Sequence, residues 1–578
     1  MSIGFRMRVA VCVLALGCLQ AVSPADGDAG KLHRVLVQGF EDAAARPRVW
    51  VVGIPNEKAS VALSDAQAKQ GKRSLKLHYE FTGPGQYLGV EFPIRINAPV
   101  EKLRFLLHGD GSGSGYGVYL IDASGETRKF RDAARMKIDF TGWREVVLDN
   151  VNARGEAWGG DKNGKVDYPI TRLVFEISTP GKPVSGELYF DALSVDSAAD
   201  ADQIAGGQVS VRSPAYGATV KGSVALQLSG RGFKKLTVKC WKQGGAFGTD
   251  STVGVAALDG KGDGSIIFPA NEYPHGPITV RIRGVSAFAS HNCYLQLYNA
   301  GGVSWNEGAP KDPPPAAKGM KLLFADDFDK ELSISRDGRG ATYRAHKLGG
   351  GDFSGIPFGD HENKATTPFS QVDTYLRIRA DEKKNTTGLI CSVREDGSGV
   401  NAKAPCYFEC RFIAQSAIGT WPAFWVMTNQ ALRPGPFNKV PSDELDVIEA
   451  YGGEGPGHPN SGGRYMIASH YWLQDKDGPK QPGFYGPIDM RKLQGGGGSS
   501  WWEASHVYGI RIGTDDTIYY CDDIEVARHK TARLSRREPL YFYVNLAVGG
   551  NSGWRKDLSA YHGIADMYVD YVRVYQGQ

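Results

Sequence analysis

Short runs in which apolar and polar residues alternate recur along most of the chain. Residues 74–81 and 173–177 alternate in this way, and glycine-rich turns such as 111–115 separate such runs. Alternation broken by frequent turns is typical of antiparallel β-sandwiches. The chain has 578 residues with 74 glycines and 11% aromatic residues, a composition that fits strands joined by tight turns. The pattern therefore predicts an all-β protein, and it disfavours a helical bundle or a repeat solenoid.

Changes in composition divide the chain into blocks, each large enough for its own core. Residues 32–197 form a first β-rich block, and a short polar and glycine-containing stretch follows it. Residues 208–305 form a second block, of the size of an immunoglobulin-like sandwich. Residues 306–320 contain four prolines, which predicts a semi-rigid spacer. The last block, 321–578, is the largest and has the densest aromatic clusters.

The first 25 residues have the pattern of a secretory signal peptide. Arg6 and Arg8 precede an apolar stretch over 9–22, and small residues follow at 23–25. The apolar stretch is too short for a membrane span, which needs about 20 residues. We therefore expect a secreted or periplasmic protein without a membrane span. A lipid-modified Cys18 remains an alternative.

The charges argue against a nucleic-acid partner. Lys and Arg number 67 and Asp and Glu number 63, which is close to balance. Six cysteines follow the signal segment: Cys240 and Cys293 in the second block, and Cys391, Cys406, Cys410 and Cys521 in the last. Buried thiols, or one disulfide in each block, are both open, whereas a zinc site is disfavoured because no histidine clusters with them. The chain is expected to act as a monomer.

The segment 443–449 carries the candidate chemistry. Period-two alternation places Glu444 and Asp446 on one face of a strand and Glu449 on the other. A single β-bulge between Val447 and Ile448 would return Glu449 to the first face. Three carboxyl groups would then share one face, and crowded acids raise one another's pKa. One ionised and one protonated carboxyl group are what retaining glycoside hydrolysis requires, although a solvated strand face with incidental acids is the plain alternative.

Nearby aromatic residues favour a saccharide groove. Trp421 and Trp425 lie four residues apart about twenty residues before the acids, and the pairs 471–472 and 501–502 follow, with His470 beside the first pair. The flat C–H faces of sugar rings stack on aromatic side chains. A core position for one Trp, and a structural hydrogen bond for His470, are the alternatives.

Five ordered motifs in 321–578 resemble glycoside hydrolase family 16. They are 421–425 (WPAFW), 444–449 (ELDVIE), 506–510 (HVYGI), 545–550 (NLAVGG) and 568–575 (YVDYVRVY). The resemblance implies a β-jelly-roll sandwich with an active cleft on its concave sheet. The bulged Glu-x-Asp-x-x-Glu spacing is similar to that of laminarinases, lichenases, agarases and carrageenases. Asp443 stands where this pattern commonly has glycine.

The resemblance also implies roles for individual residues. Glu444 would be the nucleophile, Glu449 the general acid/base, and Asp446 the helper between them. The residues expected in or beside the groove are Trp421, Trp425, His470, Trp502 and Asn545. Catalysis would need no cofactor, and a structural calcium ion would involve Asp327 and Asp570.

These patterns predict a retaining endo-β-glycanase that acts on β-1,3- or mixed β-1,3-1,4-glucan. Residues 321–578 contain 30 Lys and Arg against 32 Asp and Glu, which leans toward a neutral polysaccharide. Alternatives are a galactan hydrolase for agar or carrageenan, a transglycosylase, a non-catalytic polysaccharide-binding protein and a cell-surface adhesion protein.

The first block resembles jelly-roll carbohydrate-binding modules, whose first and last strands pair. The resemblance rests on 39–42 (GFED) and 189–196 (YFDALSVD). Candidate stacking residues, any of which equally fits a core position, are Trp50, Tyr87, Tyr116, Trp143 and Trp158. The second block is expected to act as a spacer between the sugar module and the enzyme.

Overall fold

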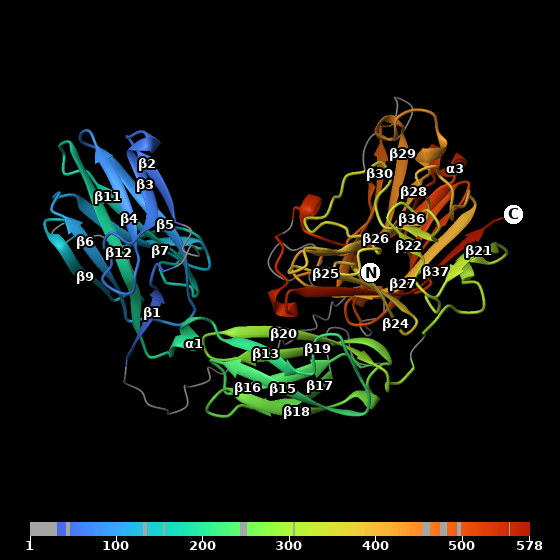
Figure 1. Cartoon of the computed structure of the whole chain (residues 1–578), viewed down its shortest axis with the longest axis horizontal. Coiled ribbons are helices and arrows are strands. Elements are labelled where there is room, and N and C mark those ends of the chain that lie inside the picture. Colours follow the sequence, from blue (N-terminus) through green and yellow to red (C-terminus); the bar gives the residue numbers. More distant parts are fainter. Residues whose placement is uncertain are drawn as a thin grey trace, which may run out of the picture. The chain divides into compact units, whose positions relative to one another are not determined.

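The computed structural model describes residues 32–41, 47–130, 136–153, 156–242, 251–304, 307–453, 463–473, 483–493, 499–553 and 555–577. The predicted signal peptide, 1–25 with Cys18, lies outside these residues. The chain divides into two compact units, Met1–Ala205 and Gly206–Gln578. Both units consist almost entirely of β-sheet, as predicted (Figure 1). No helix in the described ranges is long and apolar enough to cross a membrane.

The first unit is a sandwich of two antiparallel sheets. One sheet comprises β1 (His33–Gln38), β3 (Ala59–Ser64), β4 (Ser74–Phe81), β12 (Val184–Ser197), β6 (Lys102–Asp110) and β9 (Thr141–Asp149). The other comprises β10 (Ala157–Gly159), β8 (Glu126–Phe130), β7 (Gly115–Ile121), β11 (Ile170–Ser178), β5 (Tyr87–Ile96) and β2 (Arg48–Val52). The first strand, β1, pairs with the last, β12, as expected for this block. The short helix α1 (Ala201–Ile204) ends the unit.

The second unit begins with a smaller sandwich, called here the immunoglobulin-like block. Its three-stranded sheet comprises β13 (Gln208–Ser213), β15 (Ser223–Arg231) and β18 (Asp263–Pro269). Its five-stranded sheet comprises β14 (Ala218–Val220), β20 (Ser290–Asn299), β19 (Gly276–Val285), β16 (Lys235–Cys240) and β17 (Ser251–Ala257). Buried apolar side chains from both sheets, including Leu226, Val238 and Ile282, form one core between them.

The last block is a larger sandwich of an eight-stranded and a nine-stranded sheet. The eight-stranded sheet comprises β21 (Lys321–Asp326), β24 (Phe369–Val372), β25 (Tyr375–Asp381), β37 (Ile564–Gln576), β27 (Cys406–Ala414), β33 (His506–Ile512), β34 (Asp516–Cys521) and β35 (Ile524–Lys530). The nine-stranded sheet comprises β22 (Ile334–Ser335), β23 (Tyr343–Arg344), β26 (Gly388–Cys391), β36 (Leu540–Val548), β28 (Thr420–Thr428), β29 (Ser442–Glu449), β30 (Arg464–Trp472), β31 (Gly483–Phe484) and β32 (Ile488–Asp489). Two short helices, α2 (Met490–Leu493) and α3 (Arg533–Arg537), lie outside the sheets.

The central strand β28 shows how the sequence positions the nine-stranded sheet. Phe424 and Val426 point into the core between the two sheets. Ala423, Trp425 and Met427 alternate with them and pack in a separate cluster on the opposite face of β28. Because successive side chains of a strand point to opposite faces, this second face is available for a site.

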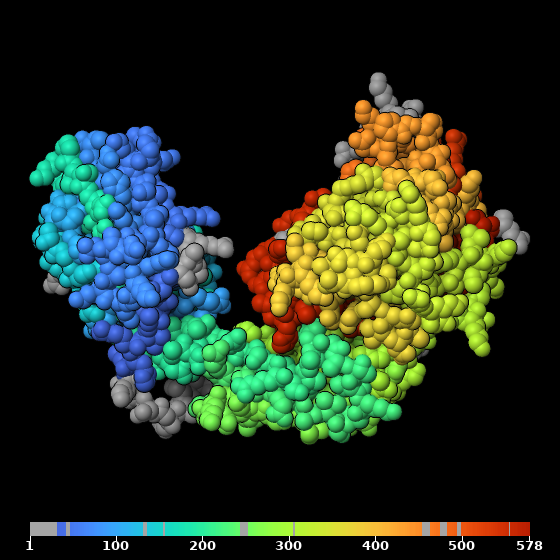
Figure 2. Space-filling model, viewed as in Figure 1, coloured from blue at the N-terminus to red at the C-terminus, as the bar shows by residue number. Residues whose placement is uncertain are grey.

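The immunoglobulin-like block packs directly against the last block within the second unit. Tyr294 of β20 stacks on Tyr561, with ring centroids 4.4 Å apart and planes only 4° from parallel. The Gln415 amide donates to Gln296 Oε1 at 2.6 Å. In Figure 2 the green atoms of the immunoglobulin-like block lie directly against yellow and red atoms of the last block.

The proline-rich segment 306–320 differs from the expected spacer, because its described part is tied to the last block. Arg573 of β37 donates to the carbonyl oxygens of Pro310 at 2.8 Å and Asp312 at 3.0 Å. The N–H of Gly308 donates to Asp570 at 3.0 Å. The prolines thus lead the chain along the eight-stranded sheet, a path that their composition alone did not predict.

The six cysteines of the described chain are all buried free thiols: Cys240, Cys293, Cys391, Cys406, Cys410 and Cys521. Of the two alternatives left open by the sequence, the structure shows buried thiols. Cys406 and Cys410 lie on β27 and point into the core between the two sheets of the last block.

Candidate active site

The predicted bulge in β29 is confirmed by the strand pairing. Ile448 lies opposite Phe424 of β28 and Asp446 lies opposite Trp425, so Val447 has no partner of its own. The pairing of β29 with β30 is irregular at the same place. Leu445, Val447 and Ile448 are buried in the core between the sheets. The bulge therefore restores Glu449 to the face of Glu444 and Asp446.

All three carboxyl groups line one cleft of about 420 Å³ on the nine-stranded sheet. The cleft crosses β36, β28, β29, β30 and β31, so residues far apart in the sequence meet there. Of the predicted groove residues, it brings together Trp421, Trp425, His470 and Asn545. Trp472, Phe484, Tyr451, Phe353 and Lys347 also line it.

Two tryptophan N–H groups each donate to one of the two glutamates. Trp472 Nε1 donates to Glu444 Oε2 at 2.9 Å. Trp421 Nε1 donates to Glu449 Oε1 at 3.1 Å, and the Tyr451 hydroxyl donates to the same oxygen at 3.3 Å. These donors orient the two carboxyl groups, and each favours the ionised form of its partner.

Burial and neighbouring groups shift the pKa of the two glutamates. Burial raises the pKa of Glu449 to about 7, with a further contribution from the charge of Glu444. Burial also raises the pKa of Glu444, but His470, the Trp472 N–H and Lys347 oppose this change. Glu449 is thus poised to hold a proton near neutral pH, as a general acid at a glycosidic bond must.

Asp446 lies between the two glutamates and is 3% exposed. Burial, together with the charges of Glu449 and Glu444, raises its pKa well above the usual range. The protonated form of this carboxyl group is therefore favoured. In that form Asp446 adds no negative charge between the glutamates.

His470 of β30 faces these acids across the strand pair. Its Nε2 is 3.4 Å from Asp446 Oδ2, and its ring stacks on Trp472 with centroids 5.3 Å apart. Ligand atoms of Glu444, Asp446 and His470 lie within 4.8 Å of one another, which within the described ranges is the one such group able to hold a metal ion. A cation there would bind the same oxygens that the acid/base chemistry uses.

Trp425 and Asn545 form the floor of the cleft. Trp425 Nε1 donates to Asn545 Oδ1 at 2.8 Å, and Asn545 Nδ2 donates to the carbonyl oxygen of Trp421 at 3.3 Å. The Trp425 ring is 5% exposed and stacks on Tyr543. Trp425 thus lies at the floor of the predicted groove and is also largely buried, as the alternative core position implied. Trp421 is the more exposed of these two tryptophans.

The structure corrects the placement of Trp502. This side chain does not line the cleft, and it lies instead in a second cavity with Tyr294 and Tyr561. Trp502 lies in the connection between α2 and β33, where no strand periodicity predicts the direction of a side chain.

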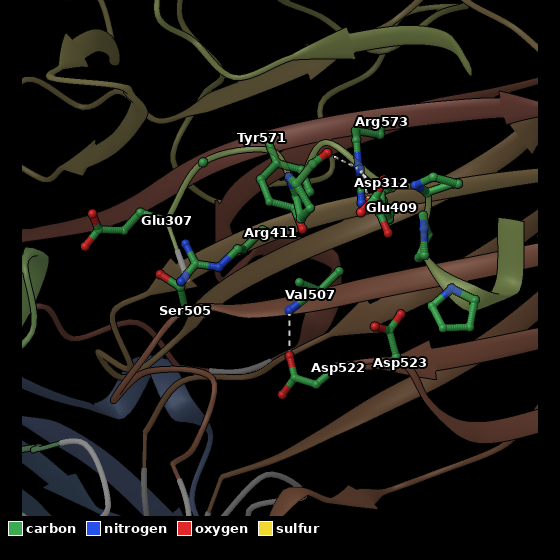
Figure 3. A pocket seen from close by; sticks show the side chains of 15 residues that line it. Glu307, Asp312, Glu409, Arg411, Ser505, Val507, Asp522, Asp523, Tyr571 and Arg573 are labelled. Atoms are coloured by element: carbon green, nitrogen blue, oxygen red, sulfur yellow. Dashed lines mark hydrogen bonds and ion pairs between the residues drawn. The ribbon is translucent and has the colours of Figure 1, made fainter. Parts of the chain in front are cut away.

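Asp570 does not fit the calcium site expected for it with Asp327. Its carboxylate is buried and pairs with the Arg411 guanidinium, besides accepting the Gly308 N–H. A guanidinium already supplies the positive charge that a calcium ion would bring. Arg411 also lines a separate cavity of about 660 Å³ between the proline-rich segment and the eight-stranded sheet, where Arg573 pairs with Glu409 (Figure 3).

Trp472 belongs to an aromatic pair expected near the groove, but it was given no position in it, and Tyr451 and Phe484 were not predicted. Trp472 was recoverable, because it stands two residues after His470 and period-two alternation places both on one face of β30. Tyr451 follows the end of β29 and Phe484 belongs to a two-residue strand. No periodic signal marks these two positions.

Comparisons with known proteins find relatives that match part of this chain. No family model matches the chain. The endo-1,3-1,4-beta-glycanase EglC of Rhizobium meliloti (strain 1021) is 28% identical over 217 residues, which are 36% of this chain and 40% of that protein. The endo-1,3-1,4-beta-glycanase ExsH of the same organism is 29% identical over 178 residues, 29% of this chain and 30% of that protein.

Endo-acting glycanases are therefore among the relatives of this chain. The similarity to such enzymes predicted from the five motifs is confirmed, although the chain spans less than half the length of these curated relatives. The solved endo-beta-1,3-glucanase from Pyrococcus furiosus is 21% identical and covers 46% of this chain and 98% of its own, with a TM-score of 0.34. The resemblance of 32–197 to carbohydrate-binding modules stays a prediction.

Proposed function

We propose that the last block is a retaining endo-β-glycanase that cleaves β-1,3- or mixed β-1,3-1,4-glucan. The observation that carries this proposal is the pair of glutamates on one face of β29, each held by its own tryptophan N–H. The names of the two Rhizobium relatives, both endo-1,3-1,4-beta-glycanases, support the choice of substrate.

In the proposed reaction Glu444 attacks the anomeric carbon while the glycosidic bond breaks. Glu449, protonated because of its raised pKa, gives its proton to the departing oxygen. The glycosyl group is then esterified to Glu444. Glu449, now ionised, takes a proton from a water molecule that attacks the same carbon, which releases the sugar with its original configuration.

The charges in the cleft favour a neutral polysaccharide over a sulfated galactan. Three carboxyl groups line it, and Lys347 is the single Lys or Arg among the described residues of its wall. Sulfate groups are usually bound by several arginine or lysine side chains. The exposed rings of Trp472 and Phe484, 48% and 62% exposed, suit the C–H faces of glucose instead.

The test is the release of reducing ends from laminarin, lichenan, agarose and carrageenans. We expect activity on a β-glucan, and a loss of several powers of ten in Glu444→Gln because the covalent step needs this carboxylate. Glu525→Gln, an exposed glutamate on β35, is the matched control and should keep full activity. Activity on a galactan alone would overturn the substrate, and binding without any turnover would favour a non-catalytic polysaccharide-binding protein.

A second function, glycan binding by the first unit, is favoured by one outer sheet face. Trp50 of β2 lies against bare backbone: a Cβ added to Gly89 would stand 2.2 Å from its ring. Trp158 and Tyr87, 46% and 36% exposed, extend the aromatic surface on the same sheet. Tyr116, also a stacking candidate from the sequence, is instead part of the core between the sheets.

Affinity electrophoresis in gels containing β-glucan tests this second proposal in the Glu444→Gln background. Trp158→Ala and Gly89→Ala, which displaces the Trp50 ring, should each weaken retention several-fold, because aromatic anchors dominate such contacts. Trp143→Ala, in the other sheet, serves as the control. Equal retention of all variants would contradict the proposal.

A further inference from the structure

A second cavity lies where the immunoglobulin-like block meets the last block. Its volume is about 250 Å³, and the proposed reaction does not use it. Asn292, His291 and Tyr294 of β20 form one wall, and Trp502, Ile418 and Ser416 of the last block form the other. Because both blocks belong to the same compact unit, the cavity is a fixed feature of that unit.

Aromatic side chains form a preorganised surface in this cavity. Tyr294 and Tyr561 are 8% and 2% exposed, and their rings stack almost parallel. Trp502 is only partly buried, so part of its indole faces the cavity, and it packs against the core of the last block. A rigid indole held in this way offers a stacking face at little entropic cost.

The polar groups of the cavity fit a ligand that carries hydroxyl groups and no charge. None of its described lining residues is Asp, Glu, Lys or Arg. Asn292 is half-buried, and its side-chain amide is one of the polar groups of the cavity wall. A sugar hydroxyl can form a hydrogen bond with such an amide.

The cavity and the catalytic cleft lie on two sides of the same pair of turns. Ile418 precedes the cleft residue Trp421 by three positions, and Gly453 follows the cleft residue Tyr451 by two. Three residues of extended chain span at most about 11 Å. The Gly453 N–H donates to Ser416 Oγ at 3.2 Å, which joins the two turns. A polysaccharide of several sugar units is long enough to reach both places.

We propose that this junction cavity is a second saccharide-binding site, which takes a neutral glycosyl unit of the polysaccharide. The sugar ring lies on Trp502, and one of its hydroxyl groups forms a hydrogen bond with the side-chain amide of Asn292. The immunoglobulin-like block then takes part in substrate binding. The identity of the sugar, a β-glucan, rests on the proposed function.

Fluorine NMR of the full chain labelled with 5-fluorotryptophan tests this site directly. The Glu444→Gln background prevents turnover, and Trp502→Phe and Trp421→Phe assign the two resonances. On titration with laminarihexaose or a mixed-linked glucan oligosaccharide, we expect the Trp502 resonance to shift as well as that of Trp421. Asn292→Ala should raise the Kd read at Trp502 about fivefold, the effect of one lost hydrogen bond.

Phe288→Ala, an exposed aromatic residue of the same block outside the cavity, is the control and should change neither Kd. A Trp421 resonance that shifts while Trp502 stays still would overturn this inference and leave the proposed function in place. An equal Kd at Trp502 in wild type and Asn292→Ala would also overturn it. If neither resonance moves and the wild type releases no reducing ends from β-glucans, the proposed function fails, and this inference fails with it.

Discussion

At the scale of single residues, each indole N–H favours the ionised form of the glutamate to which it donates, and other neighbours shift the pKa of the two carboxyl groups differently. Trp472 donates to Glu444 in addition to the influence of His470 and Lys347, whereas Glu449 keeps a pKa of about 7 despite Trp421 and Tyr451. Burial raises the pKa of both glutamates, and the charge of Glu444 raises that of Glu449 further. The structure thus relates the assignment of nucleophile and acid to particular neighbours.

Trp472 is a positioning residue, and Trp472→Phe keeps its ring while removing the N–H. The lost donor favoured ionised Glu444, so the pKa of Glu444 should rise in the variant. The acidic limb of kcat/KM should then move to higher pH, by up to about one unit for a hydrogen bond of this kind. Trp472→Ala should in addition raise KM. An acidic limb that stays in place in Trp472→Phe would contradict this role.

Glu449 must be protonated at the start of the reaction, so kcat/KM should fall as the pH rises above about 7. Trp421→Phe removes a donor that favours ionised Glu449, which should move this alkaline limb to higher pH. Profiles of kcat/KM against pH on lichenan measure both effects. An alkaline limb that moves to lower pH in Trp421→Phe would show that Glu449 is not the group responsible.

At the scale of elements, β29 is fixed at its start by a contact with α3. The N–H and Oγ of Ser535 donate to Asp443 Oδ2 at 2.7 and 2.6 Å, in a buried environment. This contact explains why an aspartate stands where the family pattern commonly has glycine. The carboxylate holds the strand that carries Glu444 next to the helix.

Ser535→Ala should therefore lower the free energy of unfolding by about 1–3 kcal/mol, because it leaves a buried carboxylate with one donor fewer. Denaturant unfolding measures the change, and the pH limbs of kcat/KM should stay where they are in the wild type. A loss below about 0.5 kcal/mol would show that the contact does not stabilise β29.

Local alternation explains which parts of the site were predictable. Glu444, Asp446 and the bulge follow from the period of one strand. His470 was predicted because it stands beside the aromatic pair 471–472. Trp502 was placed differently from expectation, since it lies in a connection without strand periodicity. Asp570 and the proline-rich segment were also placed differently, because contacts with Arg411 and Arg573 hold them. Such contacts join residues far apart in the sequence, and no periodicity reports them.

At the scale of the whole molecule, the second unit combines two sandwiches that share a buried junction. Tyr294 stacks on Tyr561, and Gln296 pairs with Gln415 across it. Elements that bury side chains against one another unfold together. The immunoglobulin-like block and the last block are therefore expected to unfold as one cooperative body.

Calorimetry of the full chain should show two transitions, one for each compact unit, and not three. Tyr294→Ala removes a buried ring from the junction and should lower the Tm of one transition by several degrees. Tyr87→Ala, on an outer face of the first unit, is the matched control and should leave that transition unchanged. A third transition in the wild type would contradict a shared junction.

The central claim is that Glu444 forms the covalent bond to the sugar and Glu449 moves the proton. Azide rescue with an activated aryl β-glucoside oligomer tests it directly, with the anomeric configuration of the glycosyl azide read by NMR. In Glu444→Ala, azide takes the place of the nucleophile and should give the α-azide. In Glu449→Ala, azide attacks the glycosyl-enzyme and should give the β-azide. The opposite assignment, or rescue of neither variant while the wild type cleaves the same substrate, would contradict the account.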